Sequence, residues 1–218
     1  MKIDVNGVTL NYEVVGNGKP LLLVHGNTMD HKCFEKGVEV LKDYYTCYMV
    51  DSRGHGESTG VDEYHYDDFV DDYIEFCNKL GLKDIYYYGL SDGGIIGVLM
   101  SSKSDIISKM VISGTNTKPD MVKKWLINII KAMVFFTKDM RMKMMLNEPH
   151  ISKETLNNVK AKTMVCAGSK DLVLEEDTRF IAENIPGAVL NIMEGEDHTS
   201  TVVKSDKFAK NCIKFFEE

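Results

Sequence analysis

Residues 85–94 decide the fold, and they read Ile85-Tyr86-Tyr87-Tyr88-Gly89-Leu90-Ser91-Asp92-Gly93-Gly94. The first four are apolar or aromatic without polar alternation, which is typical of a strand buried on both faces. Apolar residues at helical spacing follow at once, from Ile95 to Met100. The Gly-x-Ser-x-Gly motif around Ser91 therefore falls on a sharp strand-to-helix turn, which requires small neighbours. A plain glycine-rich turn is the alternative.

The same apolar character recurs along the chain. Further runs without alternation occupy residues 20–24, 45–50, 109–113, 163–167 and 189–193, and helical spacing occupies 69–80, 95–100 and 208–216. Alternation of strands and helices predicts a mostly parallel sheet covered on both faces. Residues 3–14 instead alternate apolar and polar around the turn pair Asn6-Gly7, which predicts an antiparallel N-terminal hairpin.

The 218 residues fit one domain. Residues 115–153 separate two predicted strands by more chain than a crossover helix needs, and 121–136 looks helical and apolar on more than one side. We therefore expect a single domain, 1–218, with a small helical lid insert at about 115–153.

A serine hydroxyl needs a base to become a nucleophile, and the base needs an orienting acid. At a turn of this kind the chain order should be serine, acid, histidine. His198 follows the last predicted strand, and Asp171 follows the strand at 163–167. We prefer them to their rivals, which lie in the insert or adjoin His198 in sequence: His150, Asp120, Glu196 and Asp197.

A reaction at Ser91 also needs donors for an oxyanion. The backbone N–H groups of Asp92 and Asn27 are the candidates, because Asn27 follows the strand at 20–24 in the loop His25-Gly26-Asn27-Thr28. His25 precedes the nucleophile in a tight turn, so we expect it to be structural.

Taken together, these motifs resemble the α/β-hydrolase family nearly end to end. His25-Gly26-Asn27 resembles its oxyanion loop, and residues 51–58 resemble its structural Asp-x-Arg-Gly-x-Gly-x-Ser loop. The resemblance implies the α/β-hydrolase fold, with a mostly parallel sheet, an N-terminal antiparallel hairpin, helices on both faces and a short lid. It also places Ser91, Asp171 and His198 in a catalytic triad.

The elbow is similar to that of the valacyclovir-hydrolase-like branch. That likeness implies that Asp92 contacts a substrate amino group, and a carboxylate beside the nucleophile would favour a cationic substrate. The alternative is that Asp92 only caps its helix.

The lid supplies the remaining candidates for substrate contact, Met121, Trp125 and Phe136. Residues 116–145 carry a charge of +5, which leaves −12 for the rest of the chain. The basic residues are explained by solvated helix faces, or alternatively by attraction of an anionic substrate.

Composition indicates which kinds of binding partner and cofactor to expect. The net charge of −7 disfavours nucleic acid and anionic membranes. The five scattered cysteines and the acidic N-terminal segment predict a cytoplasmic protein. No metal-ligand spacing or phosphate loop is present, so we expect no cofactor and no metal. We expect a small acyl compound as substrate, and a monomer or homodimer.

The predicted activity is a serine esterase, a carboxylesterase-like enzyme that acts through an acyl-enzyme. Thioesters, amides, C–C bonds beside a ketone and perhydrolysis remain open with the same triad. A non-catalytic ligand-binding protein on a hydrolase scaffold is the alternative of a different class.

Overall fold

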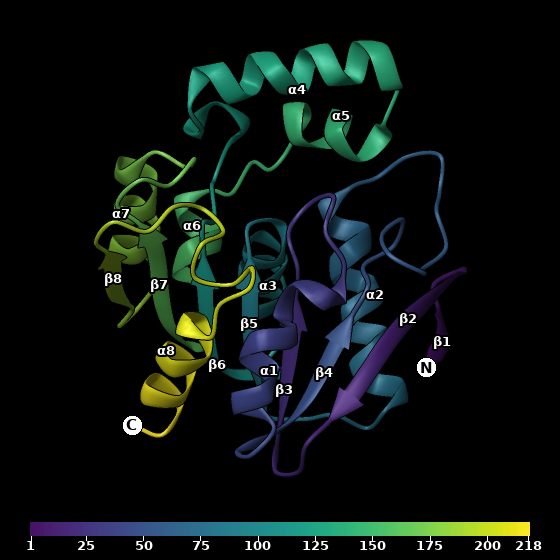
Figure 1. Cartoon of the computed structure of the whole chain (residues 1–218), viewed down its shortest axis with the longest axis vertical. Helices are drawn as coiled ribbons and strands as arrows, with labels where there is room; N and C mark the ends of the chain where they lie inside the picture. The colour runs from purple at the N-terminus through teal and green to yellow at the C-terminus, as the bar shows by residue number, and fades with distance from the viewer.

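Eight strands form one sheet in the order β1-β2-β4-β3-β5-β6-β7-β8 (Figure 1). The computed structural model describes all 218 residues. The pairs β1–β2 and β2–β4 are antiparallel and all others are parallel, which confirms the predicted hairpin and mixed sheet. The strands are β1 Lys2–Val5, β2 Val8–Val15, β3 Lys19–Val24, β4 Tyr45–Val50, β5 Ile85–Leu90, β6 Ile107–Ser113, β7 Lys162–Gly168 and β8 Val189–Met193.

Helices cover both faces of the sheet (Figure 1). One face carries α1 and α8, which contact each other, and the other carries α2, α3, α6 and α7. The helices are α1 Glu35–Leu41, α2 Tyr66–Lys79, α3 Asp92–Lys103, α4 Lys124–Thr137, α5 Met140–Asn147, α6 Lys153–Asn157, α7 Glu175–Asn184 and α8 Lys207–Phe216, with 3₁₀ turns η1 His31–Phe34 and η2 Pro119–Met121.

The strands are apolar throughout because both faces are buried. In β3, Leu22 and Val24 join the core under α2 and α3, whereas Leu21 and Leu23 join the core under α8. Successive side chains of a strand point to opposite faces, so a strand between two helical layers needs apolar residues at every position.

The sheet has a switch point beside β3. This strand pairs with β4 on one side and with β5 on the other, so the chain winds outward in both directions from it. In open α/β sheets a crevice forms at the carboxyl ends of the strands on either side of such a point. The loop after β3 and the turn after β5 therefore meet there.

The lid lies above these carboxyl ends and holds α4 and α5 (Figure 1). Its main helix begins at Lys124 after the short turn η2, so the predicted helix at 121–136 is divided near its start. Only Ile130 of α4 is buried. None of the helices has the length and apolar character that crossing a bilayer requires.

Candidate active site

Ser91 occupies a strained turn between β5 and α3. Its backbone has φ 54° and ψ −114°, outside the regions that a residue with a side chain prefers. Close packing holds the turn in place, because a Cβ on Gly93 would lie 2.1 Å from the carbonyl oxygen of Val24. The elbow is therefore pressed against the end of β3, and Ser91 precedes the N-terminus of α3.

His198 is held by Asp171. Its Nδ1–H donates to Asp171 Oδ1 at 2.7 Å, and the same carboxylate accepts from the N–H groups of Val173 and Gly168. Burial opposes ionisation of Asp171, but the hydrogen bond to His198 and these N–H donors outweigh it. The pKa of Asp171 is accordingly lowered from its ordinary value. A stable carboxylate fixes the ring so that Nε2 is free to accept a proton.

Two backbone N–H groups are available beside Ser91. Asp92 is the first residue of α3, so its N–H has no acceptor within the helix. The N–H of Asn27 makes no hydrogen bond to the protein. Asn27 also donates from Nδ2 to the carbonyl oxygen of Arg141 at 3.2 Å, which ties the loop after β3 to the lid.

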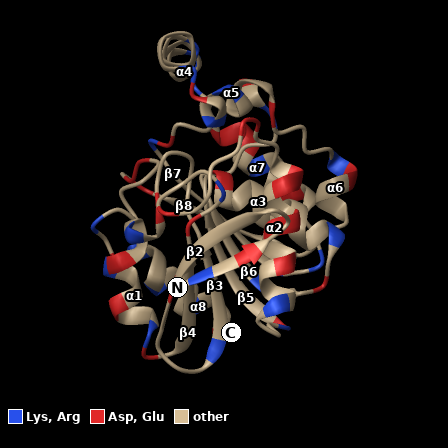
Figure 2. Ribbon diagram, turned by 90° about the vertical axis from the view of Figure 1, so that its right-hand side faces the viewer, with Lys and Arg blue, Asp and Glu red and all other residues tan.

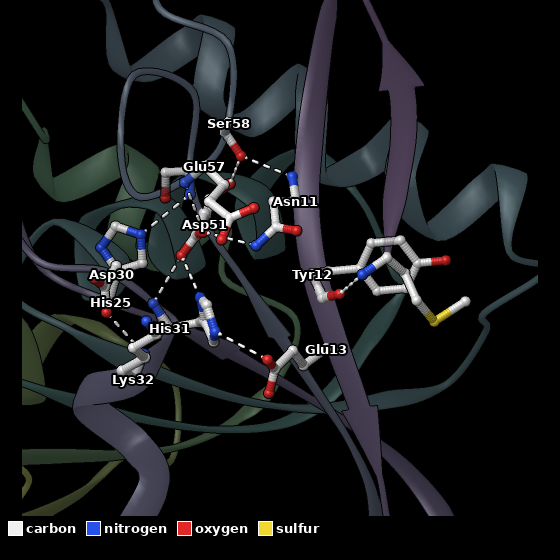
Figure 3. A network of polar contacts seen from close by, with 12 residues as sticks. Asn11, Tyr12, Glu13, His25, Asp30, His31, Lys32, Asp51, Glu57 and Ser58 are labelled. Atoms are coloured by element: carbon white, nitrogen blue, oxygen red, sulfur yellow. Dashed lines mark hydrogen bonds and ion pairs between the residues drawn. The ribbon is translucent and has the colours of Figure 1, made fainter.

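A buried polar network anchors this loop (Figure 3). Asp51, at the end of β4, accepts from the backbone and ring of His31 at 2.8 Å and from the N–H of Glu57 at 3.0 Å. Burial alone would raise the pKa of Asp51, yet these donors together hold it below its ordinary value. His25 bonds only to backbone, through Gly26 and Ser52, so its contacts are structural.

A cavity of about 200 Å³ opens at this site, and Ser91, His198 and Asn27 all line it. No Asp, Glu, Lys or Arg lines it, so none of the lid's basic residues faces the reacting centre. Its apolar walls are Met29, Leu90, Val122, Leu126, Ile129, Ile130, Met133, Met142, Met145, Leu172 and Val173.

Three predicted substrate contacts lie outside this cavity. Trp125 and Phe136 are 53% and 79% exposed on the outer side of α4, and Met121 lines a separate pocket with Thr117 and Phe180. Residues of the lid do line the cavity, but helical spacing does not say which face of an all-round apolar helix turns inward. Their neighbours Val122, Leu126 and Ile130 take those places.

Asp92 is buried behind the main cavity. Its carboxylate accepts from Tyr66 Oη at 2.9 Å and lines a small adjoining cavity that also holds Glu148. The two cavities share the wall residues Asn116, Val122, Ile130 and Met145. Desolvation by burial raises the pKa of Asp92 to about 6, although the Tyr66 hydrogen bond partly offsets it.

Asp92→Asn should change the pH dependence of stability. The pKa of Asp92 is raised in the folded protein. Its protonated form therefore contributes fully to the free energy of unfolding below the ordinary pKa of Asp, and this contribution is lost as pH rises through about 6. At 1.4 kcal/mol per tenfold change in proton affinity, the free energy of unfolding of the wild type falls by about 3 kcal/mol between acid and alkaline pH. The variant has no carboxyl at this position and should not show this fall. Urea unfolding at acid and at alkaline pH measures this difference.

The exposed Asp105→Asn serves as control, because Asp105 has no hydrogen-bond partner and no buried environment. The advantage of Asp92→Asn over wild type should grow from acid to alkaline pH, while Asp105→Asn should show none. An advantage that is equal at both pH values would contradict the burial of a titrating carboxyl.

Gly114, at the end of β6, is a site residue that sequence reasoning missed. A Cβ there would lie 2.7 Å from both Nδ1 and Cε1 of His198, and the residue has φ +63°. Gly114→Ala should therefore displace the ring and lower kcat/KM about 100-fold. Steady-state kinetics on an activated ester measures the effect.

Gly187→Ala is the matched control. Gly187 has φ +67° and no atom within 4 Å of the place that a Cβ would take, so the variant carries the backbone strain without the clash. It should lose stability but keep its kinetics. Equal kinetic losses in both variants would show that strain alone acts.

Comparisons with known proteins identify the family of the chain. A family model described as alpha/beta hydrolase fold matches residues 19–142, more than half of the chain. Serine hydrolase BPHL of Mus musculus is 29% identical over 99% of this chain and 86% of its own length. Proline iminopeptidase PfmaB of Pestalotiopsis fici is 24% identical over 99% of both chains. The enol-lactonase from Burkholderia xenovorans LB400 has the same fold, with a TM-score of 0.85, 19% identity and full coverage of both chains.

No three His, Cys, Asp or Glu side chains form a group that could hold a metal ion. The polar groups at the switch point are instead a serine, a histidine with its carboxylate, and unpaired N–H donors. The chain is therefore a hydrolase that belongs to the alpha/beta hydrolase fold family.

Proposed function

We propose that this protein is a serine hydrolase that cleaves small carboxylic esters through an acyl-enzyme on Ser91. One observation carries the proposal: His198, bonded to Asp171 at 2.7 Å, lines the same cavity as Ser91 on its strained elbow. A likeness to a protein named serine hydrolase supports it.

In the proposed reaction, Ser91 Oγ attacks the acyl carbonyl while His198 Nε2 takes its proton. Asp171 stabilises the imidazolium that forms. The N–H groups of Asn27 and Asp92 stabilise the oxyanion, at a helix N-terminus whose dipole also favours negative charge. His198 then protonates the leaving alcohol, and a water activated by His198 releases the acid.

The cavity favours an uncharged acyl group of modest size. Its walls are largely apolar and no Asp, Glu, Lys or Arg side chain lines it. At about 200 Å³ it lies below the range of drug-sized sites, which begins near 300 Å³. Short and branched acyl chains fit this description better than long ones.

Labelling with a fluorophosphonate followed by peptide mass spectrometry tests the nucleophile. The probe should modify Ser91 in the wild type and nothing in Ser91→Ala, whereas Ser102→Ala, on the same helix, should label normally. A folded wild type that takes no label would overturn the proposed mechanism. A panel of esters, thioesters, amides and vinylogous diketones would then separate the reaction classes.

Asp92 favours a second, narrower candidate, the aminoacyl esters. Its carboxylate is separated from the main cavity only by shared wall residues, so a substrate ammonium could approach it past Asn116. A valyl ester and an isovaleryl ester of the same alcohol differ only in the amino group. If Asp92 binds that group, Asp92→Asn should raise KM for the valyl ester alone; an equal change for both esters would contradict this.

A further inference from the structure

The helix α4 carries a largely exposed apolar stripe that runs from its outer side round to the active-site cavity. Trp125, Ile129, Met133 and Phe136 are 53%, 47%, 39% and 79% exposed. Their spacing of three and four residues places them along one side of the helix. Exposed apolar patches of this kind mark sites of interaction with a protein, a membrane or a ligand.

The stripe is continuous with the mouth of the active-site cavity. Ile129 and Met133 belong to it and also line the cavity that holds Ser91. An apolar phase that covers the stripe would therefore extend to the entrance of the site. A small apolar ester dissolved in that phase could then pass to Ser91 without crossing water.

A row of lysines runs along the other flank of α4. Lys124, Lys131 and Lys138 are seven residues apart, all are exposed, and none forms an ion pair. Lys138 Nζ lies 5.0 Å from the centre of the Phe135 ring, which is also exposed. A helix with aromatic residues on one side and lysines on the other has the chemistry of an interfacial helix.

The position of α4 leaves this surface open. The helix stands at one extremity of the molecule, with α5 between it and the body (Figures 1 and 2). Its main contacts within the protein are with α5 and η2. A flat surface laid on the outer side of α4 would therefore contact the aromatic residues, while the long lysine side chains of the other flank extend toward its headgroups.

From these observations we propose that the outer face of α4 docks on an anionic lipid surface, with the aromatic residues inserted and the lysines at the headgroups. The whole-chain charge of −7 predicts the opposite, but the charge is unevenly distributed. Residues 116–145 carry +5 and the rest −12. Charges more than about 8 Å apart are largely screened at physiological salt. A surface in contact with α4 therefore interacts with the positive charge of the lid and little with the negative charge of the rest of the chain.

A second copy of the chain is a poorer occupant. A two-fold pairing of α4 with α4 would place two lids of +5 and their lysine rows against each other. Anionic headgroups neutralise the same lysines, at about 1 kcal/mol for each one near the surface. The charge of the lid therefore favours the lipid surface.

Trp125 makes the test direct, because it is the only tryptophan in the chain. Its emission should shift to the blue on titration with vesicles of mixed phosphatidylglycerol and phosphatidylcholine, and the protein should sediment with them. Vesicles of phosphatidylcholine alone should give much less of either effect. Added salt should weaken binding to the anionic vesicles.

Lys131→Glu/Lys138→Glu should weaken vesicle binding by about 30-fold or more, from the loss of two surface lysines. The matched control is Lys36→Glu/Lys83→Glu, which changes the net charge equally at exposed lysines of α1 and of the turn before β5. Circular dichroism confirms that each variant is folded. Neither measurement needs turnover, so its result is independent of the proposed esterase activity.

Three results would overturn the proposal. The first is no blue shift and no sedimentation with anionic vesicles. The second is equal binding by both double variants, which would mean that the lid lysines play no part. The third is a blue-shifted Trp125 in a lipid-free dimer, detected by analytical ultracentrifugation, which would assign the stripe to a second copy.

Discussion

Replacement of Ser91 by Ala or by Gly should lower kcat by about 10⁶-fold, since residues of a triad act as a unit and little survives the loss of the nucleophile. The two variants should nevertheless differ in stability. At φ 54° and ψ −114° Ala keeps the backbone strain of Ser91, whereas Gly adopts this conformation freely. Ser91→Gly should therefore be more stable than Ser91→Ala by about 1 kcal/mol, the strain relieved less the entropy that Gly loses.

The same pair of substitutions at Ser102 provides the control. Ser102 has helical backbone in the last turn of α3, where Gly is still less stable than Ala, by up to about 1 kcal/mol. The order of the Ala and Gly variants should thus reverse between the two positions in urea unfolding. The same order at both positions would show that the elbow stores no strain, and kcat retained by Ser91→Ala would refute the nucleophile.

The strands were predictable from sequence because burial on both faces leaves an unbroken apolar run. All eight predicted strand regions are strands in the structure. The helices α2, α3 and α8 were predictable from their apolar spacing. By contrast, α1 is short and α7 begins with three acidic residues, so tertiary contacts rather than an apolar pattern define them.

The candidate site was predictable where chemistry coincides with a strand end. Ser91, Asp171, His198 and Asn27 each follow a strand, and parallel strands bring their carboxyl ends together at one edge. Gly114 follows β6 in the same way, but a glycine has no chemistry of its own to single it out. Its role comes from the space that His198 requires, which only coordinates reveal.

The hydrogen-bond partners of Asp92 and Asn27 were also not predictable from the sequence. Tyr66 and Arg141 reach them from elements far away along the chain. Nothing local to either partner marks such a pairing. Sequence therefore indicated the candidate residues for the chemistry, and packing determines which residues hold them in place.

Asp171→Asn should lower kcat by about 10⁴-fold while leaving the fold intact. Asp171 Oδ1 accepts from both the N–H of Val173 and Nδ1 of His198, so an Asn oxygen in the same place can still orient the ring. The Asn side chain is neutral, however, and cannot stabilise the imidazolium that forms when His198 takes the proton of Ser91. Its NH₂ group also meets the N–H of Gly168, a donor, where the carboxylate offered an acceptor.

Asp177→Asn is the matched control, because Asp177 is also a buried carboxyl, bonded to the N–H and hydroxyl of Thr117. It lines no part of the active-site cavity, so its variant should retain kcat. Equal losses of kcat in both variants would indicate general damage from removing a buried carboxylate. It would not support a specific role for Asp171.

The pH dependence of stability separates the same two carboxyls by sign. The pKa of Asp171 is lowered, so its contribution is present above its ordinary pKa and is lost as pH falls through the folded value. Burial raises the pKa of Asp177, so its contribution is present in acid and is lost as pH rises through the folded value. Relative to wild type, Asp171→Asn should thus be least stable at neutral pH and Asp177→Asn in acid. Urea unfolding at both pH values tests whether the Asp171 side chain that binds His198 is ionised. The proposed role of His198 as a base depends on that negative charge.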